Sequence, residues 1–121
     1  MSYYANADGA INLKRELTDS EIDDVREILD YYDSFIKGEQ ITLYRSQKNY
    51  NEDYAKNNLI TLVDYLNERE NSIDSASIEW NGEDGAIWRF VFEDNEWAEQ
   101  NGYIEWGDST QFQSSSPKNI C

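Results

Sequence analysis

The side chains that most often carry catalysis are scarce in this chain. The 121 residues include no histidine and a single cysteine, Cys121, so the Ser-His-Asp and Cys-His pairs are absent. Neither GxxxxGK[ST] nor GxGxxG occurs, which removes two phosphate-binding signatures. With 25 Asp and Glu residues, carboxylate pairs are always available, so a pair carries no signal for acid–base catalysis. We therefore predict that the chain is not an enzyme.

Metal and cofactor sites are not indicated either. Zinc prefers cysteine and histidine ligands, and the only soft ligand is Cys121. The calcium-loop pattern fails around Gly9, where its first position would be Tyr4, and around Gly85, where it would be Trp80. We expect neither a metal ion nor a cofactor.

Arg89 is the one base set among aromatic residues, between Trp88 and Phe90. On a strand, its side chain points to the opposite face from the two rings. It could bind an anion, or it could be an apolar stem with a solvated or paired head. A single arginine does not make a phosphate site, so we favour the second interpretation.

The main clue is the charge. Against 25 acids the chain has 10 Lys and Arg, which gives a formal net charge of −15. Solubility alone is met by net charges of about 2 to 8 on a small domain. This charge excludes a general attraction to nucleic acid or to an anionic membrane, and it favours a basic protein surface as the partner.

An acidic row occupies one side of the most secure predicted element, a helix over 18–36. Thr18 and Glu21 predict a capping box at its start, and Lys37-Gly38 predicts its end. The apolar side of this helix carries Ile22, Val25, Ile28, Leu29 and Tyr32. The opposite side carries Asp19, Asp23, Glu27, Asp30 and Asp33.

Only Arg26 interrupts this row, although like charges three or four residues apart each cost a few tenths of a kcal/mol. We predict that the row binds a partner; a merely solvated acidic face, as in a salt-adapted host, is the alternative. The acids at two later turns form a predicted second patch: Glu83, Asp84, Glu93 and Asp94. The bases cluster instead around the predicted second strand: Lys37, Arg45, Lys48 and Lys56.

The remaining elements follow from apolar spacing and turn residues. A second helix is predicted over 52–70, with an apolar stripe of Ala55, Leu59, Leu62, Val63 and Leu66. The predicted strands are 11–13, 40–45, 76–80 and 86–92, and the meander continues through 96–99 and a turn into 103–106. Residues 6–9 are predicted to turn, with Tyr3 and Tyr4 as the first arm of a hairpin, and 45–51 to form a polar loop.

This order, β-α-β-α-β-β-β, predicts an α+β fold in two layers. Two helices should pack on one face of a mixed sheet whose C-terminal part is an antiparallel meander. Within 86–92, Trp88, Phe90 and Phe92 should share one face. We expect one domain over 1–106 and a flexible tail over 107–121.

Size, charge and the helix TDSEIDDVREILDYYD give the chain a resemblance to small acidic anti-defence proteins of phages and mobile elements. These are anti-restriction and anti-CRISPR proteins, several of which mimic nucleic acid, and they share no common fold. NGEDGAIWRFVFEDNEW is also similar in style to uncharacterised phage proteins. The resemblance implies an inhibitor that occupies a basic nucleic-acid-binding surface of a nuclease complex.

Two alternatives stay open. The chain could be an immunity-type protein that neutralises a basic toxin. It could also be a small-ligand binder or an enzyme that uses its carboxylates and Arg89. The single cysteine and the lack of signal-peptide features or transmembrane-length apolar runs predict a cytoplasmic location, in the host cell if a phage encodes it.

Overall fold

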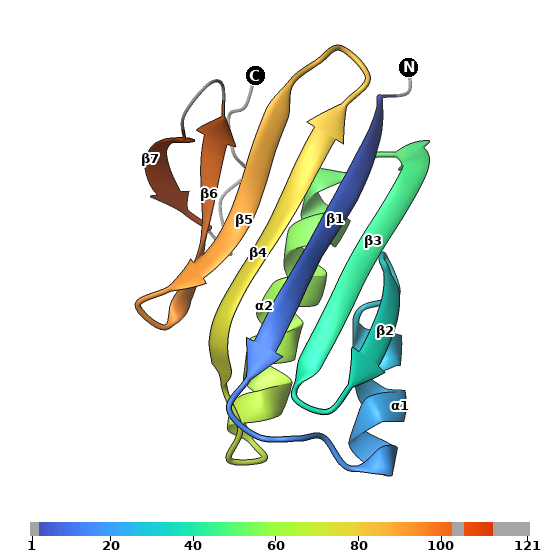
Figure 1. Ribbon diagram of the computed structural model, residues 1–121, viewed down its shortest axis with the longest axis vertical. Helices are drawn as coiled ribbons and strands as arrows, with labels where there is room; N and C mark the ends of the chain where they lie inside the picture. The colour runs from blue at the N-terminus through green and yellow to red at the C-terminus, as the bar shows by residue number, and fades with distance from the viewer. Residues whose placement is uncertain (1–2, 103–105, 113–121) are drawn as a thin grey trace.

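The described part of the chain folds into a seven-stranded sheet with two helices on one face (Figure 1). The computed structural model describes residues 3–102 and 106–112. The elements in chain order are β1 (Tyr4–Leu13), α1 (Asp19–Ile28), β2 (Asp33–Lys37), β3 (Gln40–Asn49), α2 (Glu52–Asn67), β4 (Ile73–Gly82), β5 (Ile87–Glu93), β6 (Glu96–Gly102) and β7 (Trp106–Gln111). The α+β class and the C-terminal meander are confirmed.

The sheet has the strand order β2-β3-β1-β4-β5-β6-β7, and all six pairings are antiparallel rather than mixed. The reason is β2, which the sequence did not reveal. The hairpin β2–β3 reverses the chain after α1, so β3 returns beside β1 in the opposite direction. β4 then pairs with the other side of β1, which places β1 inside the sheet, between β3 and β4.

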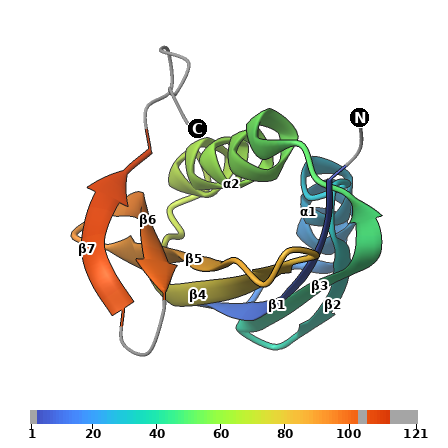
Figure 2. The same cartoon turned by 90° about the horizontal axis from the view of Figure 1, so that it is seen from above.

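The two helices lie on one side of the sheet and leave the other side bare (Figure 2). In the same view, β6 and β7 curve out of the plane of β4 and β5 toward α2. The core fills the space between the layers, and its largest fully buried side chains include Trp80, Phe90, Ile11, Ile41, Leu43, Leu59 and Leu62. The predicted inward face of β5 is confirmed, with Trp88 and Phe90 buried and Phe92 packed against the core. Most of the predicted α2 stripe is buried as well, and Val63 is half-buried.

The predicted turn at residues 6–9 is wrong, because β1 runs through it without a break. Gly9 lies opposite Ile78 of β4. A Cβ atom at Gly9 would lie 2.3 Å from the carbonyl oxygen of Ser77, so only glycine allows this close approach of the two strands. The glycine that suggested a turn is therefore a packing residue inside a strand.

The first helix is shorter than predicted: α1 ends at Ile28 instead of Ile36. After it, the Tyr31 amide donates to Asn58 Oδ1 at 2.8 Å, and the Tyr32 hydroxyl donates to the Ala55 carbonyl at 2.7 Å. Both hydrogen bonds hold residues 31 and 32 against α2, and the chain then continues as β2. Gly38, with φ of +60°, is the turn residue of the β2–β3 hairpin and not a helix stop.

Two further predictions need correction. β3 continues to Asn49 through a bulge, so most of the predicted polar loop 45–51 is strand. β7 pairs with β6 inside the predicted tail, so the boundary at residue 107 is wrong. Part of the predicted strand 103–106 and the rest of the tail, including Cys121, lie outside the described residues.

Candidate binding surfaces

The start of α1 is fixed by a paired carboxylate. Thr18 and Glu21 form the predicted capping box: the Thr18 amide donates to Glu21 Oε1 at 2.9 Å, and the Glu21 amide donates to Thr18 Oγ1 at 3.3 Å. Arg15 binds both oxygens of Glu21 at 3.2 Å. This hydrogen bond from Arg15 is the main reason why the pKa of Glu21 is lowered. Glu21 therefore serves the fold.

Three acids of the predicted row lie on α1 and are exposed: Asp19, Asp23 and Glu27. They follow one another at steps of four residues, which puts them on one helix face with neighbouring Cβ atoms roughly 5–6 Å apart. Within residues 3–102 and 106–112, none of the three makes an ion pair with a lysine or arginine. The exposed face of α1 is therefore a row of unneutralised carboxylates.

The other two acids of the row do not belong to the helix, so the prediction of a single five-residue face is wrong. Asp30 is exposed in the turn that follows α1. Asp33 begins β2, and its partner across the strands is Tyr44 of β3. The early end of α1 separates the row into a helical part and a sheet part.

Asp33 joins acids that sequence spacing did not connect. Strand register places Asp33, Tyr44, Asp8, Glu79 and Arg89 next to one another in a line across β2, β3, β1, β4 and β5. This line runs over the helix-free side of the sheet. Its three carboxylates come from distant segments, so only the strand order could reveal them.

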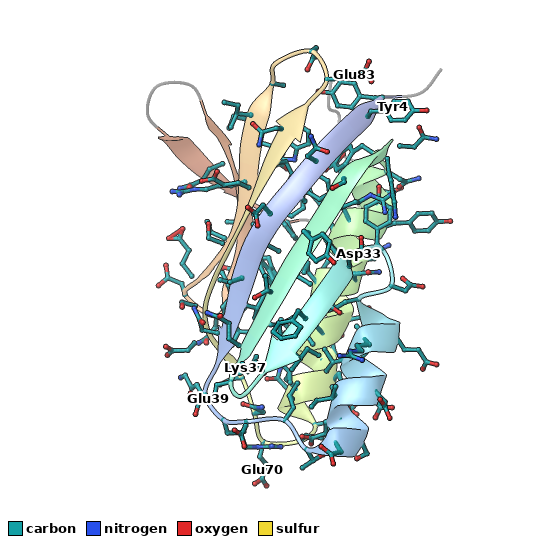
Figure 3. All side chains as sticks on the ribbon, turned by 45° about the vertical axis from the view of Figure 1, so that its right-hand side comes forward. Tyr4, Asp33, Lys37, Glu39, Glu70 and Glu83 are labelled. Carbon is teal, nitrogen blue, oxygen red and sulfur yellow. The ribbon has the colours of Figure 1, made fainter. Side chains whose placement is uncertain are left out.

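The acids at the β4–β5 turn stabilise the fold. Tyr3 donates its hydroxyl to Asp84 Oδ1 at 2.6 Å, and the Tyr4 amide donates to Glu83 Oε1 at 2.5 Å. Figure 3 shows Tyr4 and Glu83 together at one end of the molecule. Glu83 and Asp84 thus hold the beginning of β1 against the turn.

Glu93 and Asp94 lie at the opposite end of β5, in the exposed β5–β6 turn. The length of β5 separates them from Glu83 and Asp84 by about 20 Å. The predicted second patch is therefore wrong as a single surface, and its two halves have different surroundings.

The predicted cluster of bases is divided as well. Lys37 is exposed at the lower end of β2 in Figure 3. Arg45 is tied to the backbone, because its Nη1 donates to the Tyr31 carbonyl at 2.6 Å and its Nη2 to the Asn49 carbonyl at 2.8 Å. It also lies 3.6 Å from the centroid of the Tyr31 ring.

Lys56 is buried, which the sequence did not predict. Its Nζ lies 2.6 Å from Glu52 Oε2 and 2.7 Å from Glu99 Oε1. Burial by itself lowers the pKa of Lys56, but the hydrogen bonds to the two carboxylates outweigh it and the pKa is raised. Lys56 therefore stays charged and ties α2 to β6.

Arg89 fits the favoured interpretation, in which the head of an apolar stem is paired with another side chain. It lies on the face of β5 opposite Trp88 and Phe90, and its Nε donates to Gln100 Oε1 at 2.6 Å. Arg89 therefore lies on the opposite face of the sheet from the buried indoles of Trp80 and Trp88.

No protein-family model, curated protein or solved structure matches this chain. Within the described part of the chain, no helix is long and apolar enough to cross a membrane. The same residues contain no group of three or more His, Cys, Asp or Glu side chains that could hold a metal ion.

Proposed function

We propose that the protein binds a basic surface of another protein through the exposed face of α1 and the turn after it. The residues that carry this are Asp19, Asp23, Glu27 and Asp30. In line with the resemblance to anti-defence proteins, the partner surface is one that normally holds nucleic acid in a nuclease complex. The protein then acts as an inhibitor that competes with that nucleic acid.

The contrast between paired and unpaired acids supports this proposal. Several acids elsewhere are each paired with a base: Arg15 binds Glu21, and Lys56 binds Glu52 and Glu99. The α1 face receives none among the described residues, although its mutual repulsion weakens the helix. A surface that pays this cost gains fast, salt-sensitive association with a basic partner.

The acids on the bare side of the sheet strengthen the same field. Asp8, Asp33 and Glu79 add negative charge that reaches beyond contact distance at low salt. Duplex nucleic acid carries one charge per about 1.7 Å of axis, whereas steps of four residues on a helix give one per about 6 Å. The protein would therefore mimic the sign and the long range of the charge on nucleic acid, and not its spacing. The face of α1 would make the direct contact with the partner.

A competition assay tests the proposal. Purified CRISPR and restriction nucleases are each offered labelled target nucleic acid together with this protein, in about 50 and 500 mM salt, which differ strongly in screening. A triple charge reversal, Asp23→Lys, Glu27→Lys and Asp30→Lys, should keep the fold and slow association with the inhibited nuclease by at least about tenfold at low salt. The difference from wild type should shrink at high salt.

The matched control reverses three exposed acids outside α1: Glu39→Lys, Glu68→Lys and Asp74→Lys. This control changes the net charge by the same amount as the α1 triple reversal. Its association with the nuclease should therefore slow only through the weaker long-range attraction. If the α1 triple reversal competes as well as wild type, α1 is not the binding surface. If wild type inhibits a basic toxin and none of the nucleases, the immunity-type alternative replaces this proposal.

A further inference from the structure

A groove lies between α2 and the part of the sheet where β5 turns into β6. It consists of two hollows of about 170 and 290 Å³, and both are lined by Val63, Phe92 and Asn95. In Figure 2, β6 and β7 curve toward α2 on this side of the molecule. The groove is on the flank away from α1, which lies behind β2 and β3 (Figure 1).

The floor of the groove is apolar and already in place. Trp97 is buried, and its Nε1 donates to the Leu59 carbonyl at 3.1 Å, which fixes the indole against α2. The Phe92 ring meets the Trp97 ring edge-on at 5.3 Å, and Phe112 stacks on Trp97 at 6.1 Å. A floor held in this way loses little conformational freedom when another group packs on it.

The rim of the groove is acidic. Asp64 and Glu96 belong to the lining, and Glu93 and Asp94 continue the same turn. Neither hollow has a lysine or an arginine in its lining. An apolar floor with a carboxylate rim complements a segment that carries large apolar side chains flanked by Lys or Arg.

We propose that this groove docks a basic amphipathic helix of a partner protein. Along α2 the lining extends from Ile60 to Asn67, about 10 Å at 1.5 Å per residue. That length matches apolar anchors seven residues apart on a docked helix. The inference is independent of the α1 face, because it rests on other residues on the other flank, and it assigns Glu93 and Asp94 to the rim of this site.

The test measures binding of one defined probe to the full chain by fluorescence anisotropy. The probe is a labelled 15-residue peptide, about four helical turns long, made of Lys with Leu at helical spacing. A second probe has Ser in place of every Leu. The wild-type protein should bind the Leu probe at least about tenfold more tightly than the Ser probe, because only leucine fills the hollows.

Two lysine substitutions on α2 separate the groove from general charge. Val63→Lys places a cation in both hollows and should weaken binding of the Leu probe at least about tenfold. Thr61→Lys makes the equal charge change at an exposed position outside the lining and should weaken it less than about threefold. Circular dichroism and urea midpoints confirm that both variants are folded.

Equal binding of the Leu and Ser probes, equal losses in the two variants, or no binding by wild type would each overturn the proposal. Concentration-dependent dimers of wild type that Val63→Lys abolishes would also overturn it, since a second copy would then be the occupant. The α1 triple reversal should bind the Leu probe with at most the small loss expected from its net charge. Failure of the α1 proposal therefore leaves this test unchanged.

Discussion

At the scale of single residues, the sequence revealed side-chain type and local spacing but not partners from distant segments. Glu52 and Lys56 are four residues apart, so half of the buried ion pair was visible as a helical spacing. Glu99, the other half, is brought there by the β5–β6 hairpin. Gly9 was misinterpreted for the same reason. A Cβ atom at this position would clash with Ser77, which lies on another strand.

The clamp between Tyr3 and Asp84 gives a prediction about pH. Burial, the hydrogen bond to Asp84 and the nearby carboxylates raise the pKa of Tyr3 to about 12. The hydrogen bond from Tyr3 is the main cause of the lowered pKa of Asp84. Tyr3 thus contributes stability that is complete below its unfolded pKa of about 10 and is lost as pH rises through about 12. The contribution of Asp84 is present above its unfolded pKa and is lost as pH falls through its lower folded one.

Tyr3→Phe should therefore be less stable than wild type at neutral pH, and the difference should narrow in strong acid and above about pH 10. Urea midpoints measured across this range check it. Tyr54→Phe is the control for the loss of a tyrosine hydroxyl, because Tyr54 is 62 % exposed. A Tyr3→Phe difference that stays constant over the whole range would contradict the clamp.

At the scale of elements, the predictions that the structure confirms are those that depend on the residues of one segment alone. The turns at NGEDG and EDN were visible because glycine and asparagine favour the backbone of tight turns, and they correctly placed the β4–β5–β6 meander. The end of α1 was missed because residues 29–36 keep a helical apolar spacing. Their strand pairing with β3 and the bonds of Tyr31 and Tyr32 to α2 decide the outcome, and these are tertiary contacts.

Leu29 is the residue on which the end of α1 depends. It is fully buried, and its amide donates to the Val25 carbonyl at 2.9 Å as the last bond of the helix. Leu29→Ala should cost about 2–5 kcal/mol of unfolding free energy through the cavity it leaves. Chemical denaturation measures this, with Arg26→Ala, at an exposed position of the same helix, expected within about 0.5 kcal/mol of wild type. Near-equal effects of the two changes would refute the packing of α1 described here.

At the scale of the whole molecule, the net charge of −15 opposes the compact state, because like charges are closer together when the chain is folded. The net charge itself follows from the composition alone and needs no knowledge of the fold. Which acids contribute most does depend on the fold: within the described residues Asp19, Asp23 and Glu27 make no ion pair, whereas Glu21, Glu52 and Glu99 each do.

Added salt should therefore stabilise the protein. Between about 20 and 500 mM NaCl the screening length falls several-fold, and the melting temperature of wild type should rise. The α1 triple reversal should have a higher melting temperature than wild type at low salt, and added salt should raise it less. The reason is that each reversal replaces a negative charge by a positive one. Differential scanning calorimetry checks both; a wild-type melting temperature that is independent of salt would show that self-repulsion is not a significant term.

The position of β1 between β3 and β4 also bears on how the protein is made on the ribosome. β1 is synthesised before β3 and β4, yet one of its sides can be covered only after β3 has emerged and the other only after β4 has emerged. At about 5–20 residues per second, the stretch between Asn49 and Gly82 keeps the β4 side of β1 uncovered for several seconds of translation. During that interval the carboxylates of α1 and of Asp8 are already present on the nascent chain. Their charge repels other nascent copies while β1, which will become an inner strand, is still an open edge.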